Sequence, residues 1–149
     1  MIRLLGCLIL FVFLCVLSIS CADNQKGKKE NLEMQAMCSK GAKDFFNKNY
    51  PEPLALPENS NGYTNHYDSK LNKCFILINT HLSSGPVGNP NQIVSDATFL
   101  YDAYEGKEYA TLSTYKLHGE NNTPPYCEVL GKLCNEKDFQ NLIKLYMEE

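Results

Sequence analysis

The hydrophobic pattern of the chain begins with an apolar leader. Residues 4–17 form an almost unbroken apolar run that follows Arg3 and ends before Ser18 and Ser20. A membrane-spanning helix needs about 20 apolar residues, and this run is shorter. The pattern therefore predicts a secretory signal over residues 1–20. The alternative interpretation is an uncleaved anchor helix.

The next periodic segment indicates a helix. Between residues 32 and 49, small and apolar side chains recur at spacings of three and four: Met34, Cys38, Gly41, Ala42 and Phe45. Such spacing places these residues on one helical face. We therefore expect an N-terminal helix that directs Cys38 into the core. Three prolines and an Asn-Gly pair in residues 50–62 predict a loop after it.

The pattern in the middle of the chain, residues 63–116, predicts antiparallel strands. A short strand is expected at 63–67 and a turn at 68–72, before the apolar run 74–78, whose alternate residues are apolar on both faces. A strand with two apolar faces belongs in the interior of a sheet. Residues 97–116 contain two β-rich runs around Gly106, which predicts a hairpin in which this glycine supplies a positive φ.

The C-terminal segment predicts a second helix. Asn135 is a candidate N-cap with Asp138 three residues later, and an apolar stripe follows at Phe139, Leu142, Ile143 and Tyr146. The predicted fold class is α+β: an N-terminal helix, about four antiparallel strands and a C-terminal helix, stapled by disulfides. The predicted organisation is a signal over 1–20, a flexible tether over 21–31 and one domain over 32–149.

Four cysteines of the expected domain form the strongest chemical signal. An exported domain of this size uses an even set of cysteines as disulfides, and the spacing of Cys127 and Cys134 is not the tight C-x2-C pair of a zinc site. We favour Cys38–Cys74, which would join the helix to the interior strand, and Cys127–Cys134 before the second helix. The two other connectivities remain open.

Cys21 follows the leader directly. Residues 17–21, LSISC, resemble the lipobox of bacterial lipoproteins. The resemblance implies that Cys21 is diacylated on sulfur and becomes the N-terminus, so that a lipid anchors the protein in a membrane. The number of cysteines supports this interpretation. Cys7 and Cys15 leave with the signal, and four of the other five cysteines pair, so that Cys21 is left over. Alternatively, ordinary signal peptidase cleaves after Ser20 and releases a soluble protein.

Composition and motifs limit the function classes. The formal net charge is -3, and a mildly acidic domain lacks the basic surface that nucleic-acid binding requires. The sequence contains no G-x-S-x-G, no H-E-x-x-H and no glycine-rich phosphate loop, and it suggests no cofactor. The only metal-site alternative is zinc at His66, Cys74 and His81. We expect no metal, because Cys74 and His81 are seven residues apart and fall on opposite faces of a regular strand.

Tyrosines suggest a binding surface. The chain has nine, and four of them, Tyr101, Tyr104, Tyr109 and Tyr115, fall in the predicted hairpin. A tyrosine combines an apolar ring with a polar tip, which suits a half-wet sheet face that binds a peptide, a glycan or a protein. We take Tyr101 and Tyr109 as candidate binding residues. The alternative is that both are core residues, since tyrosine is common in strands.

Residues 65–78, NHYDSKLNKCFILI, are similar to segments of small exported bacterial proteins without an assigned activity. The resemblance implies a bacterial cell-envelope setting and brings no catalytic residues. The sequence thus predicts a membrane-anchored envelope lipoprotein with a non-catalytic binding domain, whose partner is an envelope protein or glycan. The alternative is a small soluble enzyme or inhibitor in the periplasm or the medium.

Overall fold

The structure is a computed structural model that describes residues 27–51, 59–84, 92–117 and 124–148. The first 26 residues, including Cys21 and the expected signal, lie outside the described residues. The described residues form two helices and one sheet. Neither described helix has the length and apolarity needed to span a bilayer.

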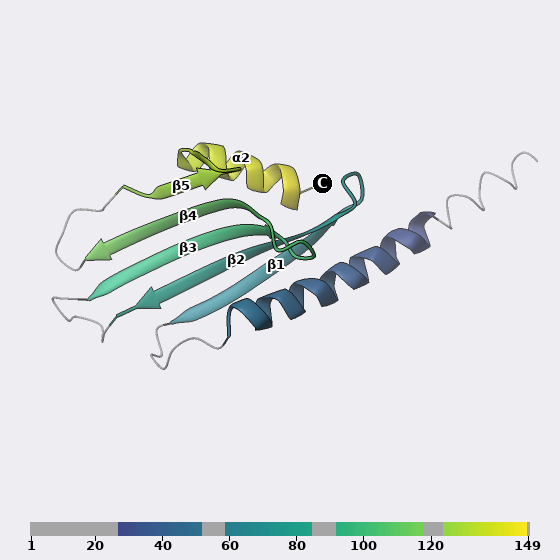
Figure 1. Ribbon diagram of the computed structural model, residues 1–149, viewed down its shortest axis with the longest axis horizontal. Helices are drawn as coiled ribbons and strands as arrows, with labels where there is room; N and C mark the ends of the chain where they lie inside the picture. The colour runs from purple at the N-terminus through teal and green to yellow at the C-terminus, as the bar shows by residue number, and fades with distance from the viewer. Residues whose placement is uncertain (1–26, 52–58, 85–91, 118–123, 149) are drawn as a thin grey trace, which may run out of the picture. The chain divides into compact units, whose positions relative to one another are not determined.

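One antiparallel sheet of six strands contains every described strand. The strands lie side by side in chain order, from β1 at one edge to β6 at the other (Figure 1). Consecutive strands pair throughout, so each connection is a hairpin. The strands are β1 (Ser60–Asp68), β2 (Lys73–Ser83), β3 (Ile93–Asp102), β4 (Glu108–Leu117), β5 (Tyr126–Val129) and β6 (Lys132–Leu133). Helix α2 (Glu136–Met147) follows β6.

The N-terminal helix, residues 27–49, crosses the boundary between two compact units, 1–36 and 37–149. In the first unit, its described residues 27–36 carry an i,i+4 contact of 3.9 Å between Lys29 and Glu33, and Leu32 is exposed. In the second unit, the helix ends at Asn49. Tyr50 precedes Pro51, and a residue before proline disfavours the helical conformation.

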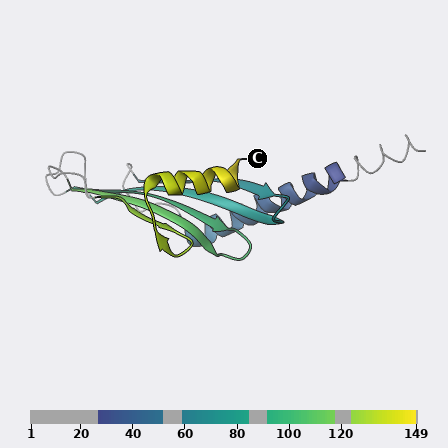
Figure 2. The ribbon, with the colours of Figure 1, turned by 90° about the horizontal axis from the view of Figure 1, so that it is seen from above.

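Within the second unit, helical segments cover both faces of the sheet. Residues 37–49 lie on one face and α2 lies on the other (Figure 2). Alternation along β2 explains this arrangement, because Cys74, Ile76 and Ile78 point to the first face while Phe75 points to α2. All four side chains are fully buried, so the prediction of an interior strand with two apolar faces is confirmed.

The α2 side contains the apolar core. Phe75 packs against Tyr146 of α2 with ring centroids 4.6 Å apart and the rings tilted, and it meets Tyr109 edge to face at 5.4 Å. Phe139, one turn into α2, is 1% exposed within this cluster. Fully burying one such side chain stabilises the fold by roughly 1.5–3 kcal/mol. The apolar stripe predicted for the second helix therefore faces the core.

Local signals in the sequence place two boundaries correctly. Asn135 accepts a hydrogen bond from the amide of Asp138, whose side chain accepts one from the amide of Asn135, so the capping box is complete. Gly106 has a φ of 66° in the turn between β3 and β4, as the predicted hairpin requires.

Two expectations differ from the structure. The sheet has six strands where about four were expected; the unassigned ones are β5 and β6, only four and two residues long. Their turn has positive φ at Leu130 and Gly131, the backbone of a tight hairpin, but it lacks the Asn-Gly pair that marks such turns in sequence. The expected tether is helical over residues 27–31, because polar residues with high helix propensity extend the helix.

Candidate binding groove

Both disulfides favoured from the sequence are present. Cys38 of the N-terminal helix is bonded to Cys74 of β2, with Cα atoms 5.2 Å apart, and Cys127 is bonded to Cys134 across the β5–β6 hairpin. The first bond fixes residues 37–49 to the sheet, and Cys38 and Cys74 are fully buried. Disulfides of this kind persist in oxidising compartments, so they indicate an extracytoplasmic environment.

Aromatic rings fill the space between the end of the N-terminal helix and the sheet. The ring centroids of Phe45 and Tyr101 of β3 are 5.3 Å apart, and those of Phe46 and Tyr63 of β1 are 4.6 Å apart. Tyr50, just after the helix, lies 6.1 Å from Phe99. Offset and tilted ring pairs at these distances are favourable contacts. They hold this segment of helix against the face of the sheet opposite to α2.

A groove of about 670 Å³ runs between the helix and the β3–β4 hairpin. Such a volume lies within the range of about 300–1,000 Å³ that ligand sites usually have. We call it the aromatic groove. Its described lining combines four rings with charged and amide groups: Gly41, Asp44, Phe45, Lys48, Asn49, Tyr50, Tyr101, Ala103, Tyr104, Glu105 and Gly106.

The hairpin side of the groove is held rigidly by Asp102, which is 1% exposed. One carboxylate oxygen of Asp102 accepts hydrogen bonds from the amides of Tyr104 at 3.0 Å and Glu105 at 3.2 Å. The other oxygen pairs with Lys73 at 2.7 Å, and this bond raises the pKa of Lys73. Because the buried carboxylate is fully paired, the turn that carries Tyr104 has one defined conformation.

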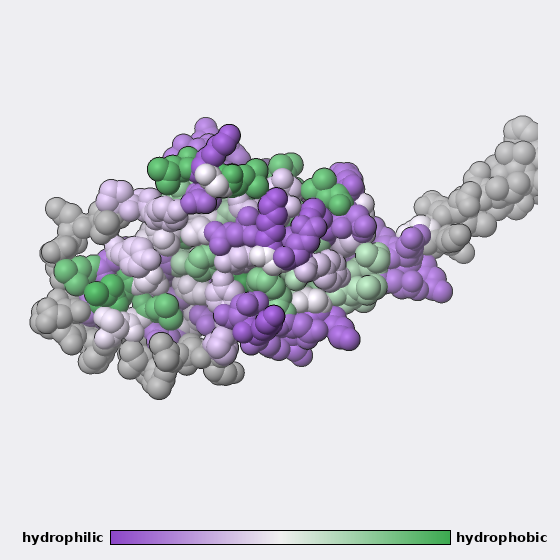
Figure 3. All heavy atoms as spheres, in the orientation of Figure 1, coloured by the Kyte–Doolittle hydropathy of each residue, from purple (hydrophilic) through white to green (hydrophobic). Residues whose placement is uncertain are grey.

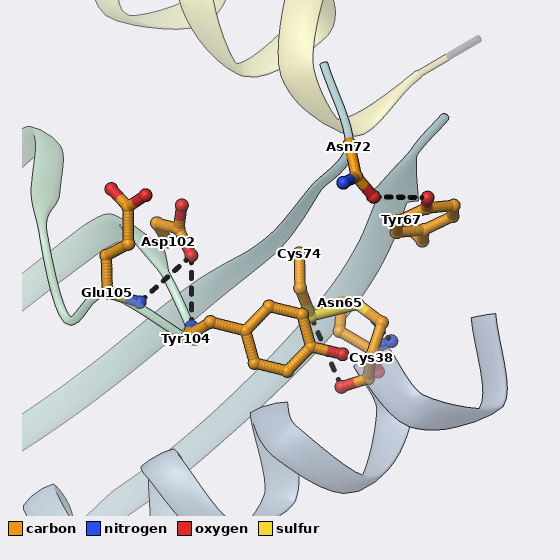
Figure 4. The surroundings of a disulfide bond; sticks show 8 residues. All are labelled: Cys38, Asn65, Tyr67, Asn72, Cys74, Asp102, Tyr104 and Glu105. Carbon is orange, nitrogen blue, oxygen red and sulfur yellow. Dashed lines mark hydrogen bonds between the residues drawn. A yellow bond between two sulfur atoms is a disulfide. The ribbon is translucent and has the colours of Figure 1, made fainter. Parts of the chain in front are cut away.

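Tyr104 forms one wall of the groove. Its side chain extends from the β3–β4 turn towards the Cys38–Cys74 disulfide (Figure 4). The ring lies so close to Gly41 that a Cβ atom there would be 2.6 Å from ring carbon Cε1. Tyr104 nevertheless remains 49% exposed. Glycine at position 41 thus allows a large aromatic ring to lie against the helix while keeping half its surface accessible.

A chain of hydrogen bonds begins at two tyrosine hydroxyls in the lining of the groove and continues to Glu108. The Tyr50 hydroxyl donates to that of Tyr101 at 3.3 Å, which donates to a carboxylate oxygen of Glu108 at 2.8 Å. The other Glu108 oxygen accepts from Thr111. Burial, with these hydrogen bonds and Glu108, raises the pKa of Tyr101. Burial also raises the pKa values of Tyr50 and Tyr104, so all three phenols remain neutral in neutral solution.

The expectation that Tyr101 and Tyr109 share one half-wet face is wrong. Tyr109 is 8% exposed and belongs to the apolar cluster under α2, whereas Tyr101 lines the groove on the opposite face. The cause is a register shift after Leu100, which places Glu108 opposite Tyr101 in the pairing of β3 with β4. A β-bulge of this kind sends the extra residue to the other face.

The zinc alternative loses its sulfur ligand, because Cys74 is in a disulfide with Cys38. Cys74 and His81 also point to opposite faces of β2, as their odd separation predicted. His81 instead contacts Asp96 of β3, with Nδ1 2.6 Å from Oδ1. Within the described ranges, no cluster of three or more His, Cys, Asp or Glu side chains is arranged to hold a metal ion.

A second group of exposed apolar residues lies apart from the groove. Hydrophobic side chains gather at the top of the molecule in Figure 3, where α2 and β5 lie in Figure 1. The exposed leucines of these elements and the adjoining hairpin are Leu130, Leu133 and Leu145. Soluble proteins commonly expose single leucines, so these three are not by themselves evidence of a site.

Sequence reasoning identified Tyr101 but missed the helical half of the groove. Asp44 and Lys48 flank the buried stripe of the N-terminal helix, where exposed charged residues have the ordinary interpretation of a solvated surface, and Tyr50 follows the helix in the predicted loop. Tyr104 was noticed only as one member of the tyrosine cluster. A usable signal was the glycine at position 41, which lies on the buried face where a larger apolar residue is usual.

Comparisons of the chain with protein-family models, with curated proteins and with solved structures found no match.

Proposed function

We propose that this protein is a cell-envelope lipoprotein, anchored through Cys21, whose domain binds an envelope component in the aromatic groove without chemical conversion. Disulfides and groove both belong to the domain that the tether would hold outside the cytoplasm. The membrane anchor and the binding groove are separate parts of the proposal, and each has its own test.

The pairing of the cysteines carries the anchoring proposal. The four cysteines of the described residues are all consumed in two disulfides. Cys7 and Cys15 lie in the expected signal, so Cys21 is the one cysteine of the expected mature chain left over. A free thiol exposed in an oxidising compartment is reactive, and acylation removes that reactivity. The lipobox-like LSISC segment supplies the matching sequence context.

The groove favours binding over catalysis. Its described lining contains no histidine, cysteine or serine, and of its two carboxylates, Asp44 and Glu105, the second is paired with Lys73. Rings, hydroxyls and an amide side chain along one groove are instead typical of a recognition surface. This observation ranks a binding domain above the alternative of a small soluble enzyme.

Intact-mass measurement of protein extracted from membranes tests the anchor. We expect residues 21–149 plus a diacylglyceryl group, usually with one further acyl chain. The variant Cys21→Ala should fold normally and leave the membrane fraction. An unmodified mass that starts at residue 21, or membrane retention of Cys21→Ala, would contradict the lipid anchor.

Co-sedimentation with washed envelope fragments tests the groove. Tyr104→Ala should reduce the fraction of lipid-free protein that sediments, because it removes an exposed wall of the groove. Tyr115→Ala is the matched control, since Tyr115 is 52% exposed against 49% for Tyr104 but does not line the groove. Equal sedimentation of both variants and the parent protein would argue against a binding role for the groove.

A further inference from the structure

The ligand class of the aromatic groove can be inferred from the groups that remain unpaired in it. Tyr104 offers half of its surface, with one side of the ring against Gly41. Phe45, Tyr50 and Tyr101 contribute further ring surface along the same groove. Such rings favour a ligand that has an apolar face.

The charged groups around the groove are mostly paired, with a small negative excess. Lys73 pairs with both Asp102, at 2.7 Å, and Glu105, with Nζ 3.0 Å from Oε2, so these three groups keep one negative charge. Asp44 and Lys48 remain, and neither has an ion-pair or hydrogen-bond partner within the described part of the chain. Their charges sum to zero. Asp44 and Glu105 disfavour an anionic ligand, and a cationic ligand would meet the Lys48 ammonium, so a neutral polar ligand that bonds both Asp44 and Lys48 fits the groove.

The unpaired polar atoms call for a ligand with both donors and acceptors. The Asp44 carboxylate accepts hydrogen bonds, the Lys48 ammonium donates them, and the Tyr104 hydroxyl does either. Asn49 uses its amide nitrogen on the carbonyl of Phe45 at 2.8 Å, which leaves its amide oxygen as an acceptor. A hydroxyl group is donor and acceptor at once, so a ligand with several hydroxyls satisfies all four groups.

We propose that the aromatic groove binds a neutral sugar ring of an oligosaccharide. A pyranose ring has C–H groups on its faces and hydroxyls around its rim. One face would lie on the Tyr104 ring, and the rim hydroxyls would bond Asp44, Lys48 and Asn49. The inference rests on the proposed binding function and specifies its ligand. Because the turn at Asp102 is rigid and fully bonded, little ordering is needed on binding.

Equilibrium dialysis tests this proposal with four neutral tetrasaccharides: tetra-N-acetylchitotetraose, cellotetraose, maltotetraose and mannotetraose. The full chain carrying Cys21→Ala keeps the protein free of lipid. We expect saturable binding of at least one of them, with a Kd on the order of 1 mM for one exposed site. Since the ligand is uncharged, added salt should change this Kd little.

Variants and competing probes make the test decisive. Tyr104→Ala and Asp44→Asn should each weaken binding about tenfold or more, whereas Tyr115→Ala should leave it unchanged. Circular dichroism and melting curves of each variant establish that the fold is retained. Salt-sensitive binding of tetralysine in place of the sugars would overturn the proposal and identify a cation site.

The outcome is separable from that of the proposed function. Saturable, Tyr104-dependent binding of a tetrasaccharide supports both. Envelope sedimentation that depends on Tyr104, without saturation by any of the four sugars at about 20 times the expected Kd, overturns the sugar assignment and leaves the binding function standing. If no tetrasaccharide binds and sedimentation with envelope fragments does not depend on Tyr104, the groove is not a binding site.

Discussion

The two faces of the sheet contain the same residue types in different settings. Under α2, Phe75, Tyr109 and Tyr146 pack against each other around Phe139 in a closed apolar cluster. Under residues 37–49, aromatic rings also line the sheet, but hydroxyls and charged groups converge there and a groove of about 670 Å³ remains open.

Packing partners, rather than residue identity, account for this difference. The α2 segment presents a continuous apolar stripe, which leaves no space between helix and sheet. The N-terminal helix presents the small residues Cys38, Gly41 and Ala42 instead. Small residues bring a helix close to the sheet at one end and leave room for rings at its side. A tyrosine is therefore a core residue on one face and part of a candidate site on the other.

Aromatic truncation should separate the two faces most strongly. Tyr109→Ala should lower the free energy of unfolding by about 3–5 kcal/mol, because it opens a cavity in the closed cluster. Tyr104→Ala, which is half exposed, should change it by less than about 0.5 kcal/mol. Urea denaturation of the two variants measures both values. Similar losses for both would show that the two faces are not distinct in the way described.

The disulfides offer a second comparison. Replacing Cys38 and Cys74 by alanine opens a disulfide whose cysteines are 36 residues apart. It should lower the free energy of unfolding by about 4 kcal/mol. Replacing Cys127 and Cys134 by alanine opens a disulfide whose cysteines are 7 residues apart. It should lower the free energy of unfolding by about 2.5 kcal/mol. Thermal unfolding of the two double variants shows which disulfide contributes more to stability. A larger loss for the shorter loop would contradict the assignment of Cys38–Cys74 as the main link between helix and sheet.

Glycine replacement in the helix tests the close approach of Tyr104. Gly41→Ala should forgo the gain of about 1 kcal/mol that alanine usually brings to a helix, because its Cβ collides with the Tyr104 ring. Gly27→Ala is the control, with nothing within 4 Å of the added Cβ. Melting curves measure the stability of both variants. A groove-binding assay should show weaker binding for Gly41→Ala and unchanged binding for Gly27→Ala. A stabilised Gly41→Ala variant with normal binding would refute the contact.

The smallest expected effect is in the alkaline range. Tyr101 has a raised pKa because of its burial, so the unfolded chain loses this proton near pH 10 while the folded protein keeps it. The unfolded state then binds fewer protons than the folded state, and stability falls as the pH rises above about 10. Tyr101→Phe should make this fall shallower in denaturation curves measured at pH 9 to 11, by comparison with the parent protein. An unchanged slope would mean that Tyr101 ionises as readily in the fold as outside it.

Much of the fold could be predicted because its signals are local. The capping box at Asn135, the glycine turn at Gly106 and the apolar faces of β2 each depend on residues close together in the sequence. The favoured disulfides followed from the faces of the elements that carry them. The leucine-glycine turn of β5 and β6 was missed because Leu130, its first residue, is not of a type that usually adopts positive φ.

The candidate site was harder to predict because it depends on one irregularity. In a regular hairpin with Leu100 opposite Ala110, Tyr101 would lie opposite Tyr109 and the two would share a face. The observed register places Tyr101 opposite Glu108 and sends Tyr109 to the core. No composition or spacing in the sequence announces this bulge. The partnership of Tyr104 with Gly41 is likewise a tertiary contact between distant segments.

One measurement tests most directly the claim that the sheet face covered by residues 37–49 is the binding face. Tyrosine ring signals can be recorded by NMR while the best-binding tetrasaccharide is added, with assignments from single Tyr→Phe variants. We predict saturable shifts of the Tyr50, Tyr101 and Tyr104 ring signals, with those of Tyr109 and Tyr146 unchanged. Shifts confined to Tyr109 and Tyr146, or no saturable shift of any ring, would contradict the account.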